Sequence, residues 1–119
     1  MSSHVRITFH EIKEVPTAQM ISLFGQIDES NLHDLKNQVD PVVKDKDVSA
    51  IVFDCNDLDF INSRVVGYLI AMCIEVGETK KLMFYRPNAY TMELIKKVGL
   101  NALMKHAINM KDVLKYIKE

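Results

Sequence analysis

The sequence contains no tryptophan, only four glycines and three prolines. It also has no apolar run of the roughly 20 residues that cross a bilayer as a helix. Residues 1–6 lack the apolar core and cleavage site of a signal peptide. No internal repeat, low-complexity tract or linker interrupts the 119 residues. These absences lead us to expect one cytoplasmic domain spanning residues 1–119, with no membrane segment.

A strong charge of either sign is also missing. With 15 basic and 16 acidic residues, the formal net charge is -1. Basic residues adjoin only in short pairs such as Lys80-Lys81 and Lys96-Lys97. The chain therefore offers no electrostatic basis for direct binding to nucleic acid or to an anionic membrane.

Cysteine is scarce, and its spacing is uninformative. Cys55 and Cys73 form no Cys-x-x-Cys motif and fall within predicted apolar elements, so we expect two buried, reduced thiols without a disulfide or a metal. Asp54, Asp57 and Asp59 invite a metal or acid–base interpretation. No histidine or additional glutamate joins them at ligand spacing, so we expect solvated loop carboxylates. The sequence predicts neither a metal nor a cofactor.

What the sequence does contain is a series of short periodic segments. Alternating apolar and polar residues predict a strand over 5–9, and a denser apolar stretch predicts a more central strand over 18–24. Pro16 and Thr17 lie between the two strands, which favours an antiparallel hairpin with Pro16 ending the first strand.

A helical stripe of apolar residues begins at Leu32. We expect Asp28 or Ser30 to cap this helix, and Pro41 to kink it or to end it early near Asp40. A strand is then expected over 50–54, followed by a helix whose apolar stripe runs from Val65 to Ile74 and which Gly77 ends. The remaining elements are expected to be a strand over 81–85, a helix over 89–98 with Val98 on its buried side, a short turn over 100–103, an edge strand over 107–109 and a helix over 110–118.

The stretch 51–67 organises the rest of the chain. An apolar strand here leads into a helix, and Asn62 or Ser63 can cap that helix by accepting a hydrogen bond from a free backbone N–H. Two leading strands followed by alternating strands and helices predict an α/β fold. We expect a mixed sheet of four or five strands, with an N-terminal hairpin, parallel later strands and flanking helices.

Three stretches of the sequence carry a resemblance to a known family. Residues 21–28, Ile-Ser-Leu-Phe-Gly-Gln-Ile-Asp, are similar to a second strand that ends in Gly-x-hydrophobic-Asp. Residues 51–63 are similar to a hydrophobic strand and its approach to a helix, and residues 86–100 to a proline-containing loop, a helix and a closing Gly-Leu. In this order they resemble the STAS domain, in particular the bacterial anti-sigma factor antagonists.

The resemblance implies a binding protein and not an enzyme. Such a chain would bind an anti-sigma factor of the serine-kinase type and so release a sigma factor, which regulates transcription by partner switching. The resemblance places the partner-binding surface at Asp28, Asn62, Ser63, Arg64 and Val65. In this mechanism the chain does no chemistry itself.

One junction departs from the family pattern Asp-Ser-Ser/Thr-Gly, in which a kinase phosphorylates the second hydroxyl residue. Here the four residues are Asn62, Ser63, Arg64 and Val65. Arg64 therefore stands at the acceptor position, and Ser63 matches the first hydroxyl of the pair. Ser63 is either a plain helix cap or a phosphoacceptor moved by one residue.

Two other classes of function stay open at this point. One is a STAS-type scaffold or sensor that assembles with copies of itself as a homo-oligomer or binds a small ligand. The other is a small enzyme using Cys55 or Ser63, although the sequence has no Gly-x-Ser-x-Gly motif and no glycine-rich phosphate loop.

Overall fold

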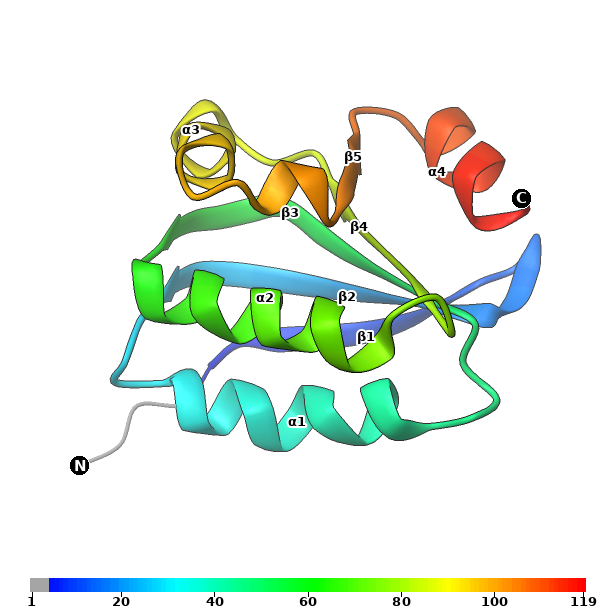
Figure 1. Ribbon diagram of the computed structural model, residues 1–119, viewed down its shortest axis with the longest axis horizontal. Coiled ribbons are helices and arrows are strands. Elements are labelled where there is room, and N and C mark those ends of the chain that lie inside the picture. The colour runs from blue at the N-terminus through cyan, green and yellow to red at the C-terminus, as the bar shows by residue number, and fades with distance from the viewer. Residues whose placement is uncertain (1–4) are drawn as a thin grey trace.

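The computed structural model describes residues 5–119, so residues 1–4 of the N-terminal segment lie outside the account that follows. Figure 1 shows a twisted central sheet with helices packed on it. The elements in chain order are β1 (Ile7–Ile12), β2 (Val15–Ile27), α1 (Leu32–Lys44), β3 (Ala50–Ile61), α2 (Ser63–Val76), β4 (Lys81–Tyr85), α3 (Ala89–Lys97), the 3-10 helix η1 (Leu100–Ala102), β5 (Lys105–Ala107) and α4 (Met110–Ile117).

The sheet has five strands in the order β1-β2-β3-β4-β5. β1 and β2 form an antiparallel hairpin, and each later strand runs parallel to its neighbour. The predicted α/β fold with a mixed sheet and an N-terminal hairpin is thus confirmed. No helix in residues 5–119 is long and apolar enough to cross a membrane.

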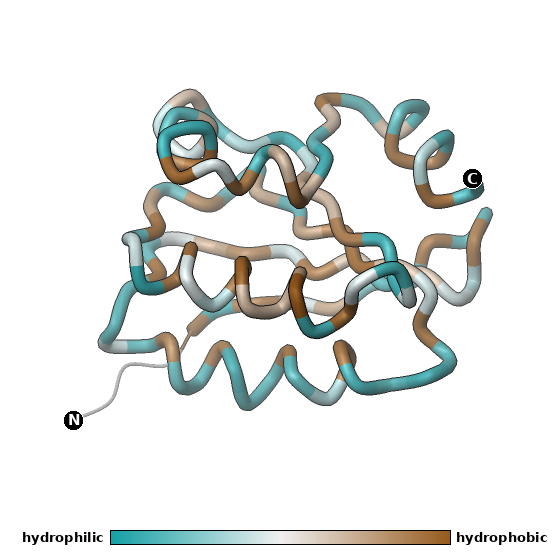
Figure 2. The backbone as a smooth tube through the Cα atoms, in the orientation of Figure 1, coloured by the Kyte–Doolittle hydropathy of each residue, from teal (hydrophilic) through white to brown (hydrophobic). Residues whose placement is uncertain are grey.

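Helices cover the two faces of the sheet unequally. α1 and α2 lie side by side across one face (Figure 1), where they and α3 enclose the larger apolar cluster. Figure 2 shows the apolar positions of α1 on the side of the helix that faces the sheet and its polar positions on the opposite side. On the opposite face α4 encloses a smaller cluster through Val113 and Ile117. The part of this face that α4 leaves uncovered carries polar side chains.

β3 is the central strand, and its first half is buried on both sides. Ile51 and Phe53 point into the larger cluster, whereas Val52 points into the smaller one. All three side chains are at most 1% exposed. This continuous apolar run is what a strand paired on both edges and covered on both faces requires.

β3 is longer than predicted, because it continues to Ile61 and does not end at Asp54. Its second half pairs in parallel with the end of β2, down to Ile27 opposite Ile61, with two register irregularities on the way. Asp57 and Asp59 are therefore exposed strand residues, and the expectation of loop carboxylates was wrong for them. The sequence pattern did not predict this extension, because Asp57 and Asp59 interrupt the run of apolar residues.

Pro16 and Pro41 do not end the elements that they were expected to end. Pro16 does not end the first strand: it lies near the start of β2, where a missing N–H is tolerated, and the turn falls at residues 13–14. α1 does not end near Asp40 but continues through Pro41 to Lys44. Pro41 removes one N–H donor and crowds the carbonyl of Asn37, a local cost that the burial of Val39 and Val43 in the core offsets.

Smaller differences concern the ends of elements and the direction of side chains. The last strand is Lys105–Ala107, two residues before the predicted 107–109. Ile74 and Val98 were assigned to apolar stripes, yet Ile74 is 73% exposed and Val98 is 40% exposed. Val98 is the C-cap residue of α3, whereas Ile74 lies on the exposed side of α2, since Met72 and Val76 on either side of it in the sequence are buried.

Phe53 offers a direct test of the core. It is 1% exposed, and its ring centroid lies 6.4 Å from that of Phe84. We expect Phe53→Ala to lower the free energy of unfolding by about 3–5 kcal/mol, because the substitution leaves a cavity. Ile74→Ala, at an exposed site, should change it by less than about 0.5 kcal/mol. Urea unfolding followed by circular dichroism measures both; similar losses would contradict the assignment of β3 to the core.

Candidate docking site at the carboxyl edge of the sheet

The β2–α1 loop and the β3–α2 junction meet at one edge of the sheet. Ile27 and Ile61, the last residues of the two parallel strands, are register partners. The backbone N–H of Asn62 donates to the carbonyl of Ile27 at 3.3 Å. Because parallel strands end at the same edge, Asp28 and Asn62 become neighbours although 34 positions separate them in the sequence.

Asn62 holds the start of α2. It is the N-cap residue, and its Oδ1 accepts a hydrogen bond from the backbone N–H of Val65 at 3.2 Å. Its Nδ2 donates to the carboxylate of Glu29 in the β2–α1 loop. One side chain therefore caps the helix and also ties the helix to the loop that precedes α1.

The β2–α1 loop is organised by its own side chains. Asn31 accepts a hydrogen bond from the N–H of Asp28 and donates one to the carbonyl of Gln26, each at 2.9 Å. The hydroxyl and the backbone N–H of Ser30 donate to Asp28 Oδ1 at 2.5 and 2.9 Å. These bonds hold the pKa of Asp28 below its usual value, so the carboxylate is ionised at neutral pH.

The cap assignments from sequence are partly corrected by this geometry. The N-cap of α1 is Asn31, not Asp28 or Ser30, and Asn31 makes no side-chain capping bond. For α2 the cap is Asn62, whereas Ser63 is already the first helical residue. The interpretation of Ser63 as a plain helix cap was therefore wrong.

We call the residues Asp28, Glu29, Asn62, Ser63 and Arg64 the rim. Ser63 and Arg64 are exposed on the first turn of α2, beside exposed Glu29 and half-buried Asp28. Arg64 is exposed, and within residues 5–119 it makes no ion pair. The rim therefore contains the carboxylates of Asp28 and Glu29, the guanidinium of Arg64 and the hydroxyl of Ser63.

Val65 is the one predicted partner-binding residue that is not on this surface. Its side chain is 1% exposed and belongs to the larger apolar cluster. It fixes the first turn of α2 on the sheet and so supports the rim from below. The structure thus brings Asp28, Asn62, Ser63 and Arg64 together at the surface and places Val65 beneath them.

Sequence reasoning missed Glu29 and Asn31 as organising residues. A general signal was available, because each of the four α-helices in residues 5–119 follows an asparagine at its N-cap. Three of these side chains accept the capping bond expected of asparagine. They are Asn62, Asn88 and Asn109, which accept from the backbone N–H groups of Val65, Thr91 and Asp112.

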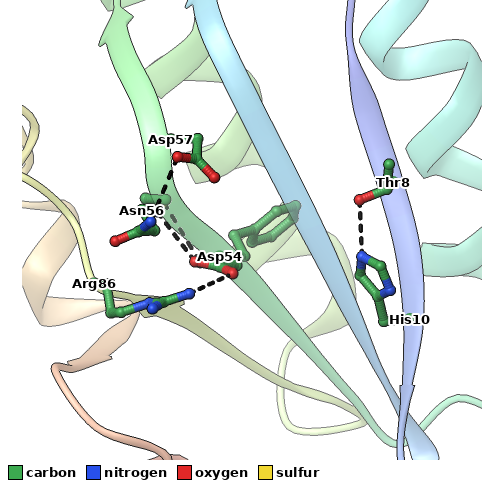
Figure 3. A network of polar contacts seen from close by, with 8 residues as sticks. Thr8, His10, Asp54, Asn56, Asp57 and Arg86 are labelled. Atoms are coloured by element: carbon green, nitrogen blue, oxygen red, sulfur yellow. Dashed lines mark hydrogen bonds and ion pairs between the residues drawn. The ribbon is translucent and has the colours of Figure 1, made fainter.

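A second polar cluster lies on the uncovered part of the other face (Figure 3). Arg86 donates to Asp54 at 3.0 Å, and its guanidinium stacks on the ring of Tyr85. The bond to Asp54 raises the pKa of Arg86. Arg86 has a positive φ of 57°, and its backbone N–H donates to the carbonyl of Ala107. The cluster joins the middle of β3, at Asp54, to the carboxyl ends of β4 and β5.

The two cysteines are free thiols, as predicted, although only Cys55 is fully buried; Cys73 is half-buried. Burial, helped by the charge of Asp54, raises the pKa of Cys55 to about 12. Burial likewise raises the pKa of Cys73 to about 11. Both thiols are therefore protonated at neutral pH, the state in which a thiol is a poor nucleophile.

Taken together, the fold and the site define a small α/β domain whose carboxyl edge presents a rigid polar rim. The model of the STAS domain family matches residues 10–115, so the chain belongs to this family. No curated protein gives a significant match to the sequence.

Solved structures with the same fold include several anti-sigma factor antagonists. One from Mycobacterium paratuberculosis has a TM-score of 0.85 at 19% identity, over 100% of both chains. SpoIIAA in its unphosphorylated form has a TM-score of 0.71 at 14% identity, over 95% of this chain and 98% of that one. The phosphorylated form from Bacillus has a TM-score of 0.70 at 16% identity, over 93% and 99%. The TM-scores establish that the folds are shared.

Substitution of Asn62 tests the dual role of this side chain. We expect Asn62→Ala to lower the free energy of unfolding by about 1 kcal/mol, because the first turn of α2 loses its cap. Asn62→Asp keeps the cap but places a second carboxylate against Glu29 in place of a donor. Double-mutant cycles with Glu29→Gln, measured by urea unfolding, should show that removing the Glu29 charge raises the free energy of unfolding of Asn62→Asp but not that of Asn62→Ala. Equal effects of Glu29→Gln in both backgrounds would contradict the contact.

Proposed function

We propose that this protein is an anti-sigma factor antagonist that binds an anti-sigma factor of the serine-kinase type. Occupation of the anti-sigma factor by this chain frees a sigma factor for transcription, so the chain acts in the cytoplasm as a competitor and not as a catalyst. The shared fold of the structurally similar antagonists supports this proposal. The raised pKa values of both thiols give the alternative of a cysteine-dependent enzyme no support.

The observation that carries the proposal is the rigid rim. Asn62 fixes the start of α2, and Asn31 fixes the loop that holds Asp28 and Glu29. Groups that are already held in place lose little conformational entropy when a partner binds. The rim is therefore suited to docking against a folded protein surface.

Arg64 determines which partner surface fits this rim. Its guanidinium is exposed and makes no ion pair within residues 5–119, whereas the neighbouring carboxylates of Asp28 and Glu29 are hydrogen-bonded inside the loop and junction. Arginine is enriched among the residues that dominate binding energy at protein interfaces. We infer that the anti-sigma factor places a carboxylate opposite Arg64.

The same geometry bears on phosphorylation. A phosphate on Ser63 would add about -1.5 to -2 charges at the first turn of α2. Glu29 already brings a carboxylate to this helix end through Asn62. Arg64 holds a cation where the family places its acceptor hydroxyl. In our proposal the chain is therefore binding-competent by default, without the need for a phosphatase.

Charge reversal at Arg64 tests the docking surface. We expect Arg64→Glu to weaken binding to the cognate anti-sigma factor by at least about tenfold, because a partner carboxylate would meet a like charge. Lys111→Glu on α4 makes the same change of charge at an exposed site away from the rim and serves as the control. Isothermal titration calorimetry measures both variants. An Arg64→Glu variant that binds as tightly as Lys111→Glu would contradict the proposed surface.

Incubation with the cognate kinase and ATP tests the default state. We expect tandem mass spectrometry to find no stoichiometric phosphate on the chain and binding to be retained, since Arg64 cannot accept a phosphate. Stoichiometric phosphate on Ser63 with loss of binding would instead show that the switch has moved by one residue. A Ser63→Ala variant that stays unmodified and bound would then confirm Ser63 as that acceptor.

A further inference from the structure

The strand β1 leaves one long edge of the sheet open. It stands at the end of the strand order, and within residues 5–119 only β2 pairs with it. Its pairing with β2 is regular from Ile7 to Glu11, and a bulge between Glu11 and Ile12 ends this regular ladder. β5 at the opposite edge has only three residues, so β1 is the longer template for another strand.

One observed hydrogen bond shows which residues of β1 direct their backbone N–H and C=O groups toward β2. The backbone N–H of Phe24 donates to the carbonyl of Arg6 at 3.2 Å, in line with the register Ile7 opposite Leu23. In an antiparallel pair, alternate residues direct their N–H and C=O groups to the same neighbour. Residues 6, 8 and 10 therefore point their backbone groups at β2, and residues 7, 9 and 11 point theirs outward.

These outward groups are symmetric about Phe9. If a second copy lies antiparallel to the first, Phe9 meets its own equivalent and Ile7 meets the second copy's Glu11. Every outward N–H then faces an outward C=O. Thr8 and His10, which contact each other at 2.8 Å on the uncovered face (Figure 3), also lie opposite each other across the junction. No like charges meet in this register.

Phe9 supplies the apolar centre that this arrangement requires. It is a large side chain that is 40% exposed in the middle of the edge strand. On the two-fold axis it would be covered by its own equivalent, which gives an aromatic cross-strand pair. A two-fold axis is also how most homodimers form, with the same patch on both subunits.

We propose that two copies of this chain associate through β1, with a two-fold axis at Phe9, into one continuous ten-stranded sheet. Stable interfaces bury about 1,200–2,000 Å² in total, whereas this ladder rests on the short regular segment Ile7–Glu11 alone. The dimer is therefore weak and depends on concentration. The rim lies on other elements, so this inference does not rest on the proposed function.

Register-specific cross-linking provides the test. In a hydrogen-bonded antiparallel pair the Cα atoms lie about 5.5 Å apart, within the range that a disulfide spans. In a Cys73→Ser background, Phe9→Cys should oxidise to a covalent dimer. Thr8→Cys should stay monomeric, because each Thr8 faces His10 and not its own equivalent. A mixture of Ile7→Cys and Glu11→Cys should cross-link with each other. Equal cross-linking of Thr8→Cys and Phe9→Cys would overturn the proposed register.

Sedimentation equilibrium tests the association itself without a covalent bond. The weight-average mass of the wild type should rise with concentration toward that of a dimer. Phe9→Lys should hold it at the monomer mass, because two ammonium groups would meet on the axis. Ile108→Lys, at a side chain that is 74% exposed on the β5–α4 connection, should leave the association unchanged. A wild type that stays monomeric, or an equal loss in both variants, would overturn the proposal.

Discussion

The parallel pairing of β2 with β3 is the constraint on which the rest of the structure depends. It extends over nearly the whole length of both strands, from Ala18 opposite Ala50 to Ile27 opposite Ile61. The first half of this pair is buried beneath helices on both faces. The second half brings two chain segments to one edge of the sheet. A shift of this register by one residue would move every buried side chain of β3 to the opposite face.

Most of the fold follows from local sequence patterns. Apolar alternation and helical stripes predict the hairpin, the alternating helices and the parallel strands, because each pattern reflects which face of an element is buried. The second half of β3 was not predictable in this way. Asp57 and Asp59 break the pattern, and their strand conformation depends on a partner strand that lies far away in the sequence. Pro41 misled for a related reason, since the burial of Val39 and Val43 against the rest of the core offsets its local cost to the helix.

Four of the five rim residues were named from the sequence, but the hydrogen bonds that build the rim were not predicted. Family resemblance brought Asp28 together with the β3–α2 junction, and the structure places them side by side. The roles of Glu29 and Asn31 arise from the path of the loop backbone, which no periodicity in the sequence reports. Val65 was misplaced because membership of a motif does not say on which side of a helix a residue lies.

The asparagines that precede the four helices have a consequence for acid tolerance. A carboxylate cap is lost when it is protonated, whereas an amide has no group that titrates in the range where proteins fold. Asn62, Asn88 and Asn109 therefore keep their capping bonds from neutral to strongly acidic solution. Since the start of α2 is capped in this way, the hydrogen bond that begins the helix bearing Ser63 does not depend on the ionisation of the capping side chain.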